Sequence, residues 1–488
     1  MTAVDSLAGV STLGDPGSAA SVAAGPSFSA FLAARRQLDA AGGFEPTAMP
    51  DHLFDFQRDL VQWAVRQGRA ALFADCGLGK SPMALAWAEN VLRHTGKPVL
   101  VLTPLAVSFQ LEHEAGKFGH DAGTSRDGSV PAGITITNYE RLEHFDTHRF
   151  GGVVCDESSA LKAFDGKRRA LVTEFLRTHQ YRLLDTATAA PNDYTELGTS
   201  SEALGHLGFM DMLARFFTNA MHTSTHRVGW RRTHGAPAAM ERQAYRLKGH
   251  AEDAFWRWVA SWARAVRRPS DLGFSDDGYE LPPLNERTHV IEATETREGA
   301  LFDVPAQGLH EQREESRRTI TERCEFAAQV LADADVAVAW CQLNDEGRLL
   351  TRLIDGAVEV SGSDPIDAKE EKLAAFGRGD IRCLVTKSSV GAWGLNWQHC
   401  HDTTVFPSHS WEQYYQLVHR FQRYGQQDPV TVHRIVTEGG RASLDSLERK
   451  AGQADRMFDA LTAHMRDALT IRRSEEHPNA VEVPPWAS

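Results

Sequence analysis

The chain has 488 residues, about three times the length of a typical domain, so a single small fold is excluded and two or three domains are expected. Its 42% hydrophobic and 24% charged residues exclude a fibrous or wholly disordered chain. The 52 Lys and Arg and 65 Asp and Glu give a formal net charge of -13, so any nucleic-acid site must be a local basic patch.

Cysteine use and hydropathy indicate a protein that stays inside the cell. The six cysteines form no Cys-x-x-Cys pair, which favours reduced thiols over a disulfide scaffold. The longest apolar runs, near residues 99–107 and 336–340, are about half the length of a membrane span. Residues 1–26 have neither a basic start nor a continuous apolar stretch, so no secretory signal is expected. We therefore expect a cytoplasmic protein with no membrane partner.

Residues 1–45 are expected to form a disordered arm that holds one short helix near residues 28–38. The first 26 residues contain no aromatic side chain and consist largely of small or polar residues. Such a composition cannot bury enough apolar surface to offset the entropy of ordering.

Two series of short apolar runs alternate with helical patterns, which is typical of parallel sheets covered by helices. The first series occupies residues 46–205, with expected strands at 71–73, 99–102, 134–137, 153–155 and 181–184. The second occupies residues 291–470, with expected strands at 336–340, 358–360, 381–385, 403–406 and 430–436. We predict an α/β protein of two tandem domains, followed by a tail at 471–488.

Residues 206–290, between the two series, are expected to form a basic helical insertion. Within residues 222–268, ten Lys and Arg face three acidic residues. Apolar side chains recur there at helical spacing and are interpreted as core. They are Phe255, Trp258, Val259, Trp262 and Val266. Arg257, Arg264 and Arg267 would occupy the other faces of that helix.

The strongest local signal is the run from Ala74 to Ser81, Ala-Asp-Cys-Gly-Leu-Gly-Lys-Ser, between an expected strand and an expected helix. Gly77 and Gly79 would let backbone N–H groups turn towards phosphate oxygens. Lys80 would reach the β and γ phosphates, and the hydroxyl of Ser81 would bind Mg²⁺. This context favours a nucleotide-binding loop over a solvated turn.

A second signal is the pair Asp156 and Glu157, which ends the apolar run 153–155. Alone, such a pair is more often a helix N-terminal charge pair. Downstream of a phosphate loop, one carboxylate can hold the metal ion while the other orients or deprotonates a water molecule.

At this point the chain resembles the superfamily two helicases and translocases, in particular the Snf-type branch and its phage-encoded relatives. Gln57, in the run 54–57, is similar to the family's adenine-reading glutamine. Thr103 and Pro104 resemble the motif that touches the nucleic-acid backbone. Residues 136–140 resemble the strand-end element before the acidic motif, and residues 186–192 stand where the family has its coupling motif.

The second series carries two further resemblances. Residues 389–396, with Gly394 in their Gly-Leu-Asn core, resemble the motif that links nucleotide state to strand contact. The run 416–426 matches the family pattern Gln-x-x-x-Arg-x-x-Arg-x-Gly-Gln at Gln416, Arg420 and Arg423. Arginines three residues apart share one face of a helix, so both could point across a cleft at a nucleotide.

The resemblance covers roughly residues 46–450 and implies two RecA-like lobes with ATP and Mg²⁺ at their interface. It implies that Lys80 and Ser81 hold phosphates and metal, Asp156 positions the ion and Glu157 is the base. DNA rather than RNA is the expected track, with protein partners unknown and the host cytoplasm as the location if the gene is a phage gene. The basic residues expected to contact phosphates are Arg231, Arg232, Arg267 and Arg268.

Departures from the family pattern leave alternatives open. Ser158 and Ser159 follow the acidic pair where the family ends in His, Ala187 and Ala189 replace Gly and Pro, and His419 replaces an acidic residue. These changes touch coupling more than hydrolysis. A helicase or a translocase is expected. The alternatives are a duplex remodeler without unwinding, a nucleic-acid-binding scaffold with weak ATPase, and a phosphotransferase or unrelated P-loop enzyme.

Overall fold

The computed structural model describes residues 42–104, 107–163, 166–219, 245–293, 309–391 and 397–476, which belong to one compact unit, residues 41–488. Most of the expected N-terminal arm, the predicted nucleic-acid contacts Arg231 and Arg232, and Gly394 of the second lobe lie outside these residues.

The first lobe is built on a sheet of seven parallel strands in the order β3-β4-β2-β5-β6-β1-β9. The strands are β1 (Arg69–Ala74), β2 (Val99–Thr103), β3 (Ala122–Thr124), β4 (Ile134–Asn138), β5 (Gly152–Cys155), β6 (Tyr181–Asp185) and β9 (Ala263–Val266). Strands β2, β4, β5 and β6 are buried along their whole length, because helices cover both faces of the sheet.

Helices of the first lobe connect these strands. They are α2 (Asp55–Gln67), α3 (Lys80–Thr95), α4 (Ser108–Lys117), α5 (Ala160–Ala163), α6 (Gly166–Arg177) and α7 (Leu197–Leu204). In α3, the fully buried Met83 and Trp87 pack in the core of the lobe. Strand β6 lies between β1 and β5, so the loop after β1 and the acidic pair after β5 meet at one edge of the sheet.

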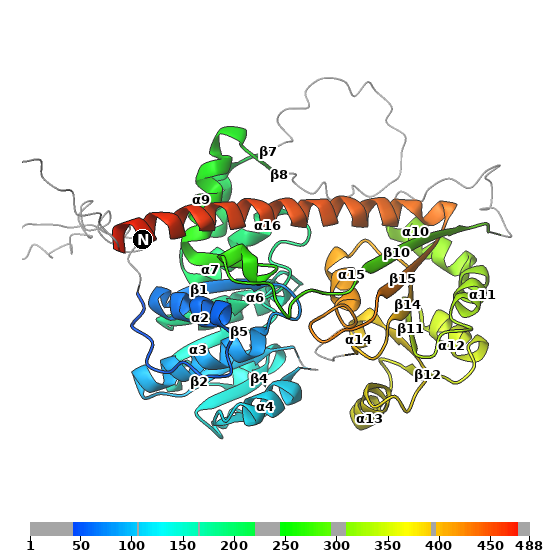
Figure 1. Cartoon of the computed structure of the whole chain (residues 1–488), viewed down its shortest axis with the longest axis horizontal. Helices are drawn as coiled ribbons and strands as arrows, with labels where there is room; N and C mark the ends of the chain where they lie inside the picture. Colours follow the sequence, from blue (N-terminus) through cyan, green and yellow to red (C-terminus); the bar gives the residue numbers. More distant parts are fainter. Residues whose placement is uncertain are drawn as a thin grey trace, which may run out of the picture. The chain divides into compact units, whose positions relative to one another are not determined.

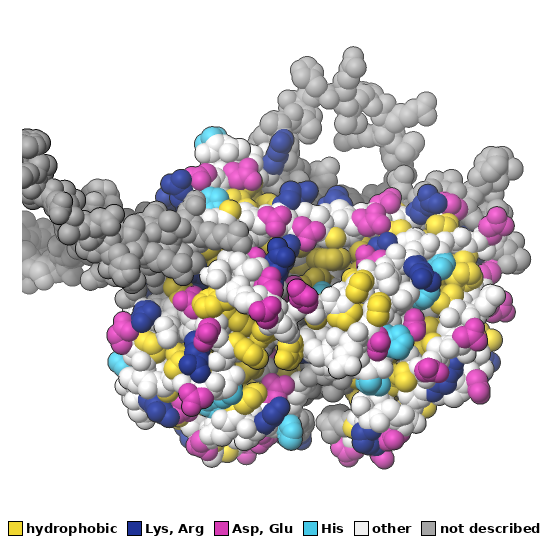
Figure 2. Space-filling model, viewed as in Figure 1, with side chains coloured by type: hydrophobic (Ala, Val, Ile, Leu, Met, Phe, Trp, Pro, Cys, Tyr) yellow, Lys and Arg dark blue, Asp and Glu magenta, His cyan; other side chains and the backbone are white. Residues whose placement is uncertain are grey.

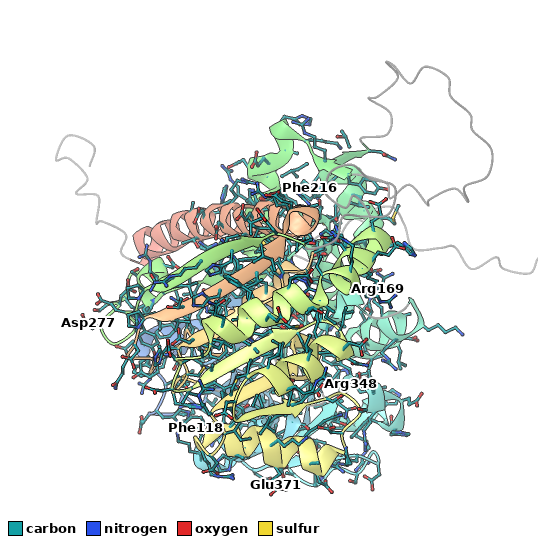
Figure 3. The ribbon with its side chains drawn as sticks, turned by 90° about the vertical axis from the view of Figure 1, so that its right-hand side faces the viewer. Phe118, Arg169, Phe216, Asp277, Arg348 and Glu371 are labelled. Carbon is teal, nitrogen blue, oxygen red and sulfur yellow. The ribbon has the colours of Figure 1, made fainter. Side chains whose placement is uncertain are left out.

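The second lobe has six parallel strands in the order β10-β15-β14-β11-β13-β12. They are β10 (Leu284–Ile291), β11 (Ala337–Cys341), β12 (Ala357–Val360), β13 (Cys383–Lys387), β14 (Asp402–Val405) and β15 (Val430–Thr437). The helices are α10 (Leu309–Arg318), α11 (Ile320–Val330), α12 (Asn344–Leu353), α13 (Ile366–Gly377), α14 (Ser388–Gly391) and α15 (Trp411–Val418). Figure 3 faces this lobe, with Arg348 on α12 and Glu371 on α13.

These two sheets confirm the predicted fold class, tandem α/β domains of parallel strands flanked by helices. All ten expected strands are present, with ends that differ by at most a few residues. Strands β9 and β10 were not expected, since residues 206–290 were assigned to an insertion. In the structure β9 pairs with β1 and extends the sheet of the first lobe. Strand β10 pairs with β15 and extends the sheet of the second lobe.

The insertion itself contains α8 (Phe209–Phe216), the antiparallel pair β7 (Phe217–Asn219) and β8 (Tyr245–Leu247), and α9 (Glu252–Trp262). The predicted apolar stripe is core at Phe255, Val259 and Trp262, all fully buried. The prediction was wrong at the end of the stripe, because the helix stops at Trp262 and Val266 lies in β9.

Arg264 also corrects the prediction of a solvated helix face. It lies in β9, is only 5% exposed, and its guanidinium stacks 4.1 Å above the ring of Trp63. Its Nη1 donates to the carbonyl of Ala263 at 3.1 Å. The stacking and the backbone hydrogen bonds compensate for burying the charge, so Arg264 belongs to the core of the first lobe.

A long last helix, α16 (Arg441–Glu476), follows the second sheet but packs on the first lobe (Figure 1). Its side chains Met457, Phe458, Leu461 and Met465 belong to the same core cluster as α9 and β9. Because α16 extends to Glu476, residues 471–476 of the expected tail form the end of this helix. Among the described residues, no helix is both long and apolar enough to cross a membrane.

Candidate functional site

The loop between β1 and α3 has the backbone of a phosphate cradle. Gly77 and Gly79 have φ of 86° and 77°, a left-handed conformation that side-chain-bearing residues rarely adopt. Lys80 is the first residue of α3, and its Nζ donates to the carbonyls of Ala74 at 3.2 Å and Asp75 at 3.4 Å. The half-buried Ser81 lies in the first turn of the same helix. The loop thus opens a helix N-terminus, where anions are favoured.

Gln57 in α2 is held against this loop. Its Nε2 donates to the carbonyl of Leu78 at 2.8 Å, and its Oε1 accepts from the backbone N–H of Phe54 at 3.0 Å. The side chain is 4% exposed, and a Cβ added to Gly79 would overlap its amide. The amide is therefore oriented by the chain itself, beside the phosphate loop.

Asp156 and Glu157 follow β5 at the same edge of the sheet. Oδ2 of Asp156 accepts from Oγ1 of Thr103 at 3.1 Å, and Oε2 of Glu157 accepts from Oγ1 of Thr186 at 3.2 Å. Glu157 has φ of 48°, the only positive φ of a non-glycine residue in the described part of the chain. Such backbone strain is concentrated at functional sites.

The electrostatics of this edge are dominated by buried charge. Burial, followed by the charge of Glu157, raises the pKa of Asp156 to about 7, while Lys80 opposes that rise. Burial alone would lower the pKa of Lys80, but Cys76, Glu157, Asp185 and Asp75 together raise it, so the ammonium stays charged. Burial raises the pKa of Asp185 well above its ordinary value.

Two residues at the site were missed by the sequence analysis. Asp185, the last residue of β6, is fully buried beside Lys80, Asp156 and Glu157. Lys162 in α5 donates through Nζ to the carbonyls of Thr188 at 3.1 Å and Ala189 at 2.7 Å. The signal for Lys162 was its position shortly after the acidic pair, and Asp185 could have been found as a carboxylate that ends an apolar strand.

The coupling segment 186–192 touches both lobes. Oγ1 of Thr188 donates to Oε1 of Glu412 in α15 at 3.2 Å. Burial raises the pKa of Glu412, although the charge of Lys162 opposes it. A cavity of about 180 Å³ adjoins this contact and is lined by both lobes, including Asp75, Ala187 and Trp411.

The second lobe presents its arginines to the phosphate loop. A Cβ added to Gly77 would lie 3.0 Å from the backbone nitrogen of Tyr424 and 3.3 Å from Cβ of Arg423. Burial and then the charge of Arg423 lower the pKa of Arg420 to about 10, while Cys76 and Glu157 raise it. Burial lowers the pKa of Arg423, and Cys76 raises it. Both guanidinium groups therefore lie in the field of the loop.

The structure corrects one expectation about these arginines. Helix α15 ends at Val418, so Gln416 is on the helix, whereas Arg420 and Arg423 follow in tight turns and share no helix face. In these turns the N–H of Arg420 donates to Leu417 O at 3.3 Å, and the N–H of Gln426 donates to Arg423 O at 3.0 Å. Gln416 is 3% exposed, and its Nε2 has no hydrogen-bond partner among the described residues.

The predicted nucleic-acid contacts are spread apart. Thr103 is buried and bound to Asp156, and Pro104 follows it directly. Arg267 is engaged by α16, at 2.9 Å from Oδ1 of Asp455 and stacked on the ring of Phe458. Arg268 has a largely exposed side chain. Figure 2 shows acidic and basic side chains mixed over the described part of one face, with no patch of a single sign.

Several observations fit a nucleotide with a divalent cation at the phosphate loop. The glycine conformations expose backbone N–H groups to phosphate, and the buried Lys80 complements its charge. The oxygens of Asp185, which have no partner among the described residues, could accept hydrogen bonds from such a group. No group of three or more His, Cys, Asp or Glu side chains in the described residues could bind an ion by itself. Phosphate oxygens would therefore have to complete the ligand set. A larger cavity, about 380 Å³, lies in the second lobe near α10 and is not at this loop.

The comparisons with known proteins give distant similarities. No family model matches the chain. Protein p41 of Acyrthosiphon pisum secondary endosymbiont phage 1 is 24% identical over 452 residues, which is 78% of this chain and 92% of that protein. The Sulfolobus solfataricus SWI2/SNF2 ATPase core in complex with dsDNA has 16% identity and a TM-score of 0.40, covering 86% of this chain and 95% of that one.

Fold and site together define a class of architecture. Two sheets of parallel strands stand in tandem, and in the first a single strand separates the strand before the phosphate loop from the strand that ends in the acidic pair. This is the arrangement of tandem RecA-like lobes.

Proposed function

We propose that the chain is an ATP-dependent motor on DNA, a helicase or translocase that hydrolyses ATP between its two lobes. The observation that carries the proposal is the approach of Arg423 and Tyr424 to Gly77. It brings positive side chains of the second lobe to a phosphate loop of the first. A P-loop enzyme acting on a small molecule does not need this second lobe.

The first lobe would bind and activate the nucleotide. Lys80 binds the β and γ phosphates, and Gln57 pairs with the adenine edge through an amide already oriented by Leu78 and Phe54. Ser81 and Asp156 would hold Mg²⁺, which when bound neutralises charge on the phosphates. Glu157 orients or deprotonates the attacking water, close to Thr186 of the coupling segment.

The second lobe would complete the site only when the lobes are closed. Arg420 and Arg423 stabilise the charge that develops on the γ phosphate, in the manner of arginine fingers. Gln416 is buried next to these turns, and its amide nitrogen has no hydrogen-bond partner within the described part of the chain. Because Thr188 is bound to Glu412 across the lobes, a change at the nucleotide would be passed to the second lobe through this contact.

DNA is proposed as the track because the motifs resemble those of DNA translocases. Arg231, Arg232, Arg268, Thr103 and Pro104 remain the proposed nucleic-acid contacts, and Gly394 the proposed link between nucleotide and strand. Arg267 is paired with Asp455 and stacked on Phe458, so we assign it to the fold instead. Lobe closure and reopening during each cycle would move the chain along DNA.

The test is steady-state ATP hydrolysis without nucleic acid and with single-stranded DNA, duplex DNA or RNA. Lys80→Ala is the blank. We expect stimulation by DNA, and stimulation by duplex DNA together with displacement of a third strand would favour translocation over unwinding. ATP binding without turnover on any polymer would contradict the motor and favour a scaffold.

A further inference from the structure

Asp185 has a buried carboxylate that no described group satisfies. The residue is 0% exposed, and neither Oδ1 nor Oδ2 has a hydrogen-bond partner among the described residues. Buried polar groups in folded proteins are almost always hydrogen-bonded, because an unsatisfied one costs free energy. The carboxylate therefore calls for a partner that the described residues do not supply.

The strand register puts Asp185 at the phosphate site. Asp185 ends β6 and pairs in register with Leu72 of β1, two residues before Ala74, where β1 ends. On the other side Leu184 pairs with Cys155, the residue before Asp156. The carboxylate lies in the electrostatic field of Lys80, Asp156 and Glu157.

The lysine at the site does not explain the buried carboxylate. Nζ of Lys80 donates to the carbonyls of Ala74 and Asp75, and no ion pair within 4.0 Å joins it to a carboxylate in the described part of the chain. The strand does not need the side chain either. The backbone carbonyl of Asp185 already accepts from the N–H of Ser158 at 2.8 Å.

We propose that Asp185 is a positioning residue for the divalent cation that enters with ATP. Its carboxylate accepts hydrogen bonds from water molecules that the cation carries, alongside Asp156. Mg²⁺ retains several water ligands when it is bound by one or two carboxylates and nucleotide phosphates, so a further carboxylate can act through those water molecules. This inference rests on the proposed ATP site, and it adds a second acidic positioning residue to that site.

The two oxygens of Asp185 also predict a selective effect. Asparagine fills the same buried space but replaces one acceptor oxygen with a donor, so it cannot accept hydrogen bonds from the cation's water molecules with both atoms. Asp185→Asn should therefore weaken cation binding but leave cation-free ATP binding unchanged. Groups that hydrogen-bond to the ligands of a metal typically contribute about 10- to 100-fold to its affinity, which sets the expected effect.

The experiment measures equilibrium binding of a fluorescent ATP analogue in excess Mg²⁺ and in excess EDTA. The ratio of the dissociation constant in EDTA to the dissociation constant in Mg²⁺ reports how much the cation contributes to ATP binding. We expect Asp185→Asn to reduce this ratio by about 10- to 100-fold. The affinity of Mn²⁺ for the ADP complex, followed by electron paramagnetic resonance, should fall by the same factor.

A matched control removes another buried carboxylate of the same chain. Glu346 lies in α12 of the second lobe, is 0% exposed, and its Oε2 accepts from the backbone N–H of Gln342 at 2.7 Å. Glu346→Gln should leave the ratio unchanged. If Asp185→Asn does not fold, Asp185→Ser supplies the same comparison, because serine lacks the charge and is smaller.

The outcomes separate this inference from the proposed function. Wild-type binding that is lost in Lys80→Ala, with an unchanged ratio in Asp185→Asn, would overturn the role of Asp185 and keep the ATP site. Failure of the wild-type chain to bind ATP under either condition would overturn both. An equal loss of affinity with and without Mg²⁺ would show that Asp185 acts on the fold rather than on the cation.

Discussion

The phenol of Tyr415 in α15 donates a hydrogen bond to Oδ1 of Asp75 in the loop after β1. One residue before Gln416, the second lobe is thus joined directly to the phosphate loop of the first. The N–H of Cys76 donates to the same oxygen at 2.5 Å, so the carboxylate orders the start of the loop and connects it to the other lobe.

Removing the Tyr415 hydroxyl should loosen the phosphate loop. A hydrogen bond to a charged group contributes about 1.5 to 3 kcal/mol. We expect Tyr415→Phe to speed hydrogen exchange of backbone N–H groups in residues 75–79 by about tenfold or more, measured by mass spectrometry. The neighbouring Tyr414 donates to Glu286 within the second lobe, so Tyr414→Phe is the control. Equal exchange of this segment in both variants would disprove the contribution of the contact.

Substitutions of the adjacent Arg267 and Arg268 should have different effects, one on protein stability and the other on nucleic-acid binding. Arg267 is paired with Asp455 of α16 and stacked on Phe458, whereas the Arg268 side chain is 68% exposed. We expect Arg267→Ala to lower the free energy of unfolding by about 1 to 2 kcal/mol through these contacts.

Arg268→Ala should instead act on nucleic acid. Loss of one phosphate contact reduces the slope of log affinity against log salt by about 1. Binding of a duplex measured at several salt concentrations tests this, together with thermal unfolding of both variants. A reduced salt slope in Arg267→Ala with unchanged unfolding would reverse the assignment.

The raised pKa of Asp156 predicts a pH-dependent stability. Burial and the charge of Glu157 raise the pKa to about 7 from an ordinary 3.8, so between these values the folded chain binds more protons than the unfolded one. The contribution of this group to stability therefore falls as pH rises from about 4 to about 7. Asp156→Asn cannot ionise, so it should gain more in thermal midpoint at pH 8 than at pH 5. An equal gain at both values would contradict the burial of this charge.

Gln57 should set the preference for adenine. Its amide is oriented by Leu78 and Phe54, so the remaining donor and acceptor can pair with a base edge. We expect Gln57→Ala to weaken ATP binding by about tenfold, since each lost hydrogen bond contributes about 0.5 to 1.5 kcal/mol. GTP binding should change little, and titration with both nucleotides measures the difference. A similar loss for both would mean that Gln57 supports the loop rather than reads the base.

The sheets could be predicted because their strands are continuously apolar. Val99–Thr103 and Gly152–Cys155 have no exposed residue, and such runs differ clearly from helical patterns. Strand β9 was not predicted because Val266, its last residue, continues the helical spacing of the apolar side chains in α9. The sequence pattern therefore gave no sign that the helix ends and a strand begins. The unexpected β10 has mostly exposed residues at the edge of its sheet, and its pattern is therefore polar.

The candidate site could be predicted where its residues are close together in the sequence. The glycines and Lys80 belong to one short run, and the acidic pair directly follows one apolar run. The turns at Arg420 and Arg423 were not, because an arginine spacing of three suits a helix as well as successive turns. The role of Asp185 depends on β6 lying between β1 and β5, and the burial of Arg264 depends on Trp63, which is 201 positions earlier. Both follow only from tertiary contacts.

We propose that ATP is hydrolysed at a site shared by the two lobes. Single-turnover hydrolysis by wild type and Arg423→Ala tests this, with ATP and duplex DNA saturating and ATP affinity measured in parallel. An arginine finger contributes about 10³-fold or more to the rate, so we expect a loss of that size with ATP still bound. Hydrolysis by Arg423→Ala at the wild-type rate would contradict a shared site.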